Sequence, residues 1–132
     1  MRKAAAKQGD TITATDTHII LVPAPPGQPV PTPVELPFTG VINGNLSRDV
    51  NIMGLPAAIQ GSTAENIPPH TVPPSTPFQR PPTNKAQITM CASTVRINGK
   101  PAARNDDTAI TCNDPADLPK GKVIATGTVM MG

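Results

Sequence analysis

Residues 50–58 read VNIMGLPAA, and residues 95–103 read VRINGKPAA. The two stretches share valine, isoleucine, glycine, proline and both final alanines in register. In the second stretch apolar and polar residues alternate up to Asn98-Gly99, a pair that tolerates the positive φ angles of a type I′ turn. Met53-Gly54 takes the same place in the first stretch with weaker turn chemistry. Each stretch therefore predicts a β-hairpin.

A third copy of this unit is divided between the two ends of the chain. Residues 4–10 (AAAKQGD) resemble its second half, and residues 126–132 (TGTVMMG) resemble the strand that leads into its turn. Gly61 and the Asn105-Asp106 pair follow the alanines and predict a turn at the opposite end of each hairpin. The repeat predicts an all-β fold of three hairpins around a common axis.

The composition excludes most other folds. Among 132 residues there are 18 prolines, 10 glycines, two phenylalanines, and no tryptophan or tyrosine. Proline at this density interrupts any window long enough for a helix, and the scarcity of aromatic residues excludes a core of large rings. We expect one small domain over residues 1–132, stabilised by a metal, a disulfide or a partner because its core is thin.

Two proline-rich segments, residues 23–38 and 68–82, separate the hairpins. Taken alone, each is typical of a polyproline II ligand or a linker, or is disordered. Both lie close to a histidine, at the same end of the hairpins. We therefore expect extended loops laid against the strands and stiffened by proline.

Charge and hydropathy limit the partners and the compartment. The net charge is only +2, and the basic residues are scattered without aromatic neighbours, which disfavours nucleic acid as a partner. No stretch approaches the roughly 20 apolar residues of a membrane span. The start MRKAAAKQGD lacks an apolar segment, so we expect no signal peptide and synthesis in a reducing cytoplasm. In that compartment, two cysteines are expected to be free thiols or metal ligands and not a disulfide.

Three metal-ligating residue types occupy related positions of the repeat. His18 and His70 each lie 12 residues beyond the last alanine of their copy, and Cys112 lies 9 residues beyond the third. Three such side chains would converge at one end of a threefold axis. Imidazole and thiolate together favour zinc, which takes four ligands in structural sites.

The fourth ligand is open at this stage. Cys91, in the stretch ITMC, would complete a set of two histidines and two cysteines. Glu35, a water molecule or a backbone group are the alternatives for that place. Cys91 has two other interpretations: a buried free thiol that acts as a small hydrophobic residue, and a disulfide with Cys112 formed after export.

Catalytic motifs are missing from the sequence. It contains no Walker A loop, HExxH, GxSxG or dinucleotide fingerprint, and its aspartates are typical of turns. We therefore expect no enzymatic activity. Two alternatives stay open: a proline-rich adaptor that docks in an aromatic groove, and a zinc hydrolase that keeps one coordination position for water.

Residues 101–104 (PAAR) carry a resemblance to the PAAR-repeat family, whose name is this tetrapeptide. The preceding NGK, the acidic turn that follows, PAA at 56–58 and AAK at 5–7 fit the family pattern, so the resemblance covers essentially the whole chain. It implies a small cone of β-hairpins with pseudo-threefold symmetry and a zinc ion at the apex. Family apices commonly use three histidines and one cysteine. Here His18, His70 and Cys112 carry over by repeat position, and the fourth ligand does not.

The resemblance also implies a role. Members cap the trimeric central spike, of the VgrG or phage-baseplate type, in type VI secretion systems and related contractile injection systems. We expect a monomeric tip that sits on the spike through an apolar base of Met53, Leu55 and Ile97, with Met130 and Met131 nearby. It would be assembled at the spike tip, help to pierce the target envelope while contacting the target membrane only transiently, and be ejected outside the cell or into the target cell. Effector cargo would be a further partner.

Overall fold

The described part of the chain folds into β-strands and loops. The computed structural model describes residues 2–91 and 94–132, and no helix occurs among them. The described residues therefore contain no helix long and apolar enough to cross a membrane. Twelve strands make up the fold: β1 (Lys3–Ala4), β2 (Thr11–Val22), β3 (Val30–Gly44), β4 (Asn51–Ile52), β5 (Leu55–Pro56), β6 (Thr63–Asn66), β7 (Lys85–Met90), β8 (Arg96–Ile97), β9 (Lys100–Pro101), β10 (Thr108–Thr111), β11 (Leu118–Ile124) and β12 (Met130–Met131). The all-β prediction is confirmed.

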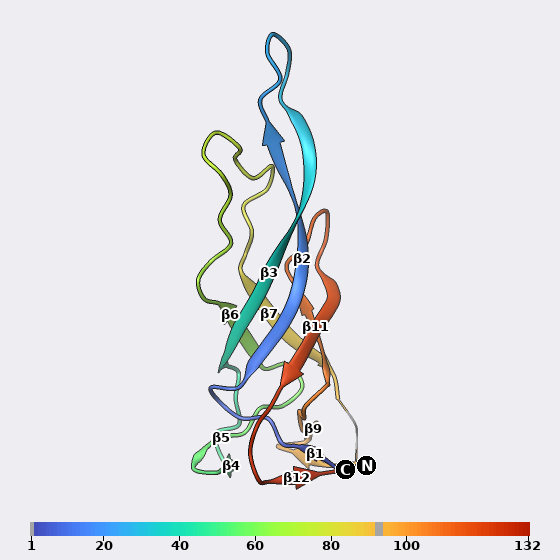
Figure 1. Ribbon diagram of the computed structural model, residues 1–132. Helices are drawn as coiled ribbons and strands as arrows, with labels where there is room; N and C mark the ends of the chain where they lie inside the picture. The colour runs from blue at the N-terminus through green and yellow to red at the C-terminus, as the bar shows by residue number, and fades with distance from the viewer. Residues whose placement is uncertain (1, 92–93) are drawn as a thin grey trace.

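The longer strands close on themselves, and the short strands form a base below them. The closed sheet has the antiparallel order β10-β11-β2-β3-β6-β7. Three two-stranded pairs, β4-β5, β8-β9 and β1-β12, lie together at the broad end, while β2 and β3 extend farthest toward the narrow end (Figure 1). The molecule is thus a tapering body on three short hairpins.

The three predicted hairpins are present. Met53 and Gly54 have φ angles of 52° and 82°, and Asn98 and Gly99 have 54° and 77°, as a type I′ turn requires. The third pair joins the two ends of the chain, because β1 pairs with β12 through Lys3↔Met131 and the next residue pair. The divided third copy of the repeat is therefore an antiparallel strand pair in the place of a hairpin, with no turn joining its two strands.

A ring of main-chain hydrogen bonds surrounds the pseudo-threefold axis. The amide of Ala6 donates to the carbonyl of Ala103 (2.9 Å), that of Ala103 to Ala58 (3.0 Å), and that of Ala58 to Ala6 (3.0 Å). All three alanines are completely buried. Since each residue of this alanine ring both donates and accepts, the three copies fix one another's positions, and only small side chains fit where they converge.

The turn that follows each alanine also repeats. A side-chain oxygen accepts a hydrogen bond from the main-chain amide three residues earlier, and a residue with positive φ precedes it. The three bonds are Lys7 N to Asp10 Oδ2 (3.0 Å), Ile59 N to Ser62 Oγ (2.9 Å) and Arg104 N to Asp107 Oδ2 (2.7 Å). The turns predicted at Gly61 and Asn105-Asp106 are confirmed.

The core is thin and rich in alanine. Its main cluster has one phenylalanine, Phe38, as the largest side chain, three isoleucines, one valine, one cysteine and seven alanines. A second cluster lies beneath the alanine ring and contains Ile52, Ile59 and Ile97. Ile97 is only 7% exposed, so it supports the base from behind and does not form its outer surface.

The first proline-rich segment differs from the predicted loop, since residues 30–38 belong to β3 and every one of them pairs with β2. Its prolines lie where a strand tolerates them. The amides of Ile19 and Leu21 donate to groups outside β3, so their partners Pro33 and Pro31 occupy non-hydrogen-bonded pairs and need no amide toward β2. Because prolines are rare in strands, the sequence did not predict a strand over residues 30–38.

The second proline-rich segment is a loop laid against a strand, as predicted. The amide of Leu21 donates to the carbonyl of Pro77 and the amide of Gln79 donates to the carbonyl of Ile19, both at 2.8 Å. Phe78 forms an isolated bridge with Ile20 between these two bonds. The loop therefore covers the free edge of β2 near the narrow end.

The alanine ring predicts a sharp steric limit. Ala103→Val adds two methyl groups at a fully buried three-way contact, so we expect a loss of about 1–3 kcal/mol in the free energy of unfolding, measured by chemical denaturation. Ala116→Val, at an exposed position in the turn between β10 and β11, is the matched control and should change little. Equal stability of the two variants would contradict the packing argument.

Candidate metal centre

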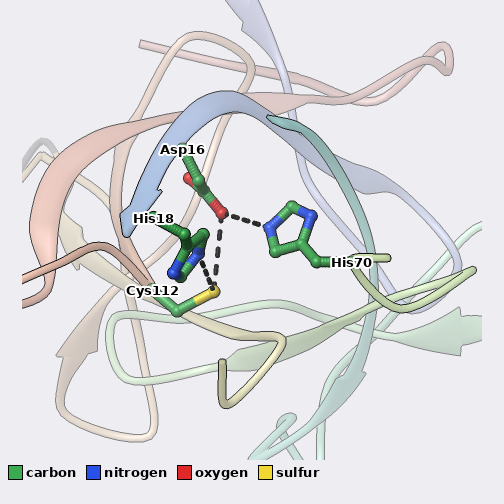
Figure 2. A group of neighbouring side chains, drawn as sticks. All are labelled: Asp16, His18, His70 and Cys112. Carbon is green, nitrogen blue, oxygen red and sulfur yellow. Dashed lines mark hydrogen bonds and ion pairs between the residues drawn. The ribbon is translucent and has the colours of Figure 1, made fainter. Parts of the chain in front are cut away.

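Four buried side chains meet inside the narrow end of the closed sheet. Asp16 and His18 come from β2, His70 from the second proline-rich loop, and Cys112 from the residue after β10 (Figure 2). One ligand atom of each lies within 4.8 Å of those of the other three. Because side chains alternate along a strand, residues 16 and 18 share the inward face of β2. These residues are called the four-donor group below.

Asp16 is the hub of this group. Its Oδ1 accepts a hydrogen bond from Thr111 Oγ1 at 2.6 Å, and its Oδ2 lies 2.9 Å from His70 Nε2. The thiol of Cys112 lies 3.5 Å from the same Oδ2 and 3.6 Å from His18 Nε2 (Figure 2). The carboxylate therefore faces both the thiol and one imidazole and is held from behind by a hydroxyl.

The ionisation of the group suits a cation. Burial, together with the neighbouring His70, lowers the pKa of His18, so this imidazole is neutral at neutral pH and keeps a lone pair for a metal. Burial and the charge of Asp16 raise the pKa of the Cys112 thiol to about 11. A metal that binds here must therefore displace the thiol proton, as thiolate ligation requires.

Asp114 forms an outer layer behind His18. Its Oδ2 accepts the amide of Ile19 at 2.8 Å and lies 3.5 Å from His18 Nδ1, and its Oδ1 pairs with Arg80 Nε at 3.0 Å. His18 Nδ1 is buried and has no better partner. An Nδ1 proton directed at this carboxylate leaves the lone pair of Nε2 free in the four-donor group, the arrangement usual for metal-bound histidine.

The donor set fits zinc. Two imidazoles, a thiol and a carboxylate are the ligand types that zinc takes in proteins, and four of them fill a tetrahedral site. With thiolate and carboxylate ionised, a divalent cation would give a centre with no net charge, which lowers the cost of its burial.

The structure brings together three of the four predicted ligands, His18, His70 and Cys112. Cys91 is not in the group. It follows β7, whose residue Met90 pairs with Thr108 at the start of β10, whereas Cys112 follows the end of β10. The two cysteines therefore lie at opposite ends of the β7-β10 pair, and both are free thiols.

Cys91 stays out of the group because of this distance, and its own surroundings differ from those of Cys112. Burial, with Asp107 nearby, raises the pKa of its thiol to about 12. Asp16 is the fourth member of the group, and sequence reasoning missed it although it stands two residues before His18 on an alternating strand. Glu35, another alternative, is exposed on β3.

Comparison with protein families gives one result. The family model for the PAAR motif matches residues 37–116, more than half of the chain, and the protein belongs to the PAAR family. The matched region contains His70 and Cys112; Asp16 and His18 precede it. Comparison with curated proteins and with solved structures gave no significant match.

Membership indicates the general role. The PAAR motif is a structural motif associated with spike tips in secretion systems and is not an enzyme family. Proteins of this family associate with spike proteins. The fold agrees with the predicted class: all-β, with a six-stranded sheet and a candidate metal cluster.

The role of Asp114 is testable through metal affinity. Asp114→Asn keeps the size of the side chain and an oxygen that accepts the Ile19 amide, but it removes the negative charge that orients His18. We therefore expect a tenfold to hundredfold weaker zinc affinity, measured by competition with a chromophoric chelator. Asp117→Asn, in the same exposed turn, is the control and should leave the affinity unchanged. Identical affinities for both variants would show that Asp114 does not act on His18.

Proposed function

We propose that this protein is the zinc-stabilised tip of a contractile injection system of the type VI secretion kind, and that its base caps a trimeric central spike of the VgrG or phage-baseplate type. The observation that carries the proposal is the alanine ring, which gives one chain three equivalent edges at its base. A single copy can then meet three identical subunits without a mismatch of symmetry.

The zinc ion would be held by His18, His70, Cys112 and Asp16. When bound, it supplies a cross-link between β2, the second proline-rich loop and the end of β10, which are far apart in the sequence. Four protein donors complete a tetrahedral shell and leave no place for a reactive water, which favours a structural site over the hydrolase alternative.

Metal content and thermal stability test this assignment. We expect about one zinc per chain by elemental analysis, and a large drop in melting temperature on chelation because structural zinc contributes on the order of 10 kcal/mol to folding. Asp16→Asn and Cys112→Ser should lose zinc. Cys91→Ser is the matched control and should retain it. Full zinc in the Asp16 variant, or its loss in the Cys91 variant, would reverse the assignment of the fourth ligand.

The base offers an apolar surface to the spike. Met53 is 53% exposed, Leu55 41% and Met130 51%, and each belongs to one of the short hairpins or its turn. Of the predicted docking residues, Met53 and Leu55 remain in this proposal. Ile97 is not part of the surface, because it is buried and packs with Ile52 and Ile59 in the second cluster.

Docking is testable with a purified trimeric spike protein. We expect Met53→Asp combined with Met130→Asp to abolish co-elution with the spike, because both changes place charge in an apolar contact. Val30→Asp, an equally exposed valine at the far end, is the control and should co-elute normally. Normal binding by the base variant would reject this docking surface.

The proline-rich adaptor is the weaker alternative. One proline-rich segment forms much of β3, and the other is hydrogen-bonded to β2, so neither is a free polyproline ligand. In the proposed role the chain acts as a monomer, is assembled onto the spike in the cytoplasm and leaves the cell with it. Effector cargo would travel as a separate partner.

A further inference from the structure

The β2-β3 hairpin continues past the four-donor group as a projecting arm, defined here as residues 19–34. The register runs on from His18↔Val34 to Val22↔Val30 before the turn. Figure 1 shows this hairpin as the most distant part of the narrow end. Four further residue pairs span about 14 Å at the usual rise of a strand.

The arm carries no charge. Its sequence, IILVPAPPGQPVPTPV, contains only apolar residues, glycine, one glutamine and one threonine. Val30 is 51% exposed, and most of the prolines are exposed as well. The neighbouring loop residues 71–79 (TVPPSTPFQ) are also uncharged. Charged side chains begin below the arm, at Glu35, Arg80 and Asp114.

The outer edge of β3 in the arm presents no backbone donor. Even-numbered residues of β3 bond to β2, so the odd-numbered positions face outward. Within the arm these positions are Pro31 and Pro33, which have no amide hydrogen. The first outward amide of β3 belongs to Glu35, where the charged residues begin.

The outer edge of β2 is closed in another way. The amide of Ile19 donates to Asp114 Oδ2, and the amide of Leu21 donates to the carbonyl of Pro77, both at 2.8 Å. The next outward position is Pro23, which has no amide hydrogen. Both edges of the arm therefore lack free donors, although it is a hairpin at the margin of a sheet.

An ordinary hairpin edge has free amides and carbonyls, which are costly in hydrocarbon and recruit other strands in water; the arm removes the amide part of this cost. We propose that the arm is a lipid-contacting element that enters the apolar region of one bilayer leaflet. Its length of about 14 Å reaches about half of a hydrocarbon core that is roughly 30 Å thick. The charged residues at its foot set the depth. The proposal rests on the proposed function only for delivery of the arm to a membrane.

A fluorescence reporter tests the depth of insertion. The chain has no tryptophan, so Val30→Trp places a single probe on the arm, and Val129→Trp places one on the base. We mix each protein with phosphatidylcholine vesicles that carry bromine at shallow or deep acyl positions. We expect a blue shift and strong quenching for the arm probe only. Equal quenching of both probes, or none for the arm probe, would overturn the proposal.

Two further variants separate insertion from other roles of the prolines. Val30→Asp should lower vesicle partition about tenfold or more in a flotation assay, since a charge must be desolvated, while Met53→Asp at the base should not. Pro31→Thr combined with Pro33→Thr restores two outward amides and should also weaken partition. The proposal fails if that double variant self-associates and the unaltered protein does not partition into vesicles. The prolines would then serve only to block the addition of other strands.

The spike assay keeps the two proposals distinct. Val30→Asp should still co-elute with the trimeric spike, because it lies at the opposite end from the base. If Val30→Asp loses vesicle partition but still binds the spike, the result concerns the arm and leaves the tip assignment untouched. If the base variant loses spike binding but still partitions into vesicles, the result concerns the tip assignment and leaves the arm untouched.

Discussion

The alanine ring is the constraint on which the rest of the structure depends. Three main-chain hydrogen bonds link residues from the beginning, middle and later part of the chain, and none involves a side chain. Because the three alanines are fully buried, the repeats approach closely enough for backbones to bond directly. The three hairpins below the ring and the turns beside it then occupy equivalent places.

The alanine ring also determines where the four-donor group lies. Each turn beside it starts a strand, loop or hairpin that runs toward the narrow end, so β2, the His70 loop and β10 converge there. The core along this path is mostly alanine and isoleucine, with one buried phenylalanine. Four polar groups replace a hydrophobic core at the narrow end. They contact one another, Thr111 and Asn66, while His18 Nδ1 faces Asp114 at 3.5 Å without a hydrogen bond.

Much of this arrangement was predictable from the sequence. The aligned VxIxGxPAA stretches gave the hairpins, their turns and the divided third copy, because turn chemistry and strand alternation are local. His18, His70 and Cys112 followed from their distance to equivalent alanines. The assignment to the PAAR family, made on the tetrapeptide and its surroundings, is confirmed by the family model.

Other features depended on pairing between distant residues. Asp16 gave no signal by residue type, since aspartates are common in turns, and only the inward face of β2 marks it. Cys91 looked like a ligand because the sequence does not reveal that β7 pairs with β10. That pairing places Cys91 and Cys112 at opposite ends of the two strands. The strand at residues 30–38 was hidden by prolines, which fit only because its outer edge is unpaired.

The pairing of β1 with β12 has a consequence for the order of folding. Ala6 bonds to Ala103, and Lys3 pairs with Met131, so these contacts join residues about 100 or more positions apart in the sequence. Closing a loop of that length costs conformational entropy before any contact repays it, so such pairings form slowly. The local hairpins β4-β5 and β8-β9 therefore form early, and the β1-β12 pair completes the base late.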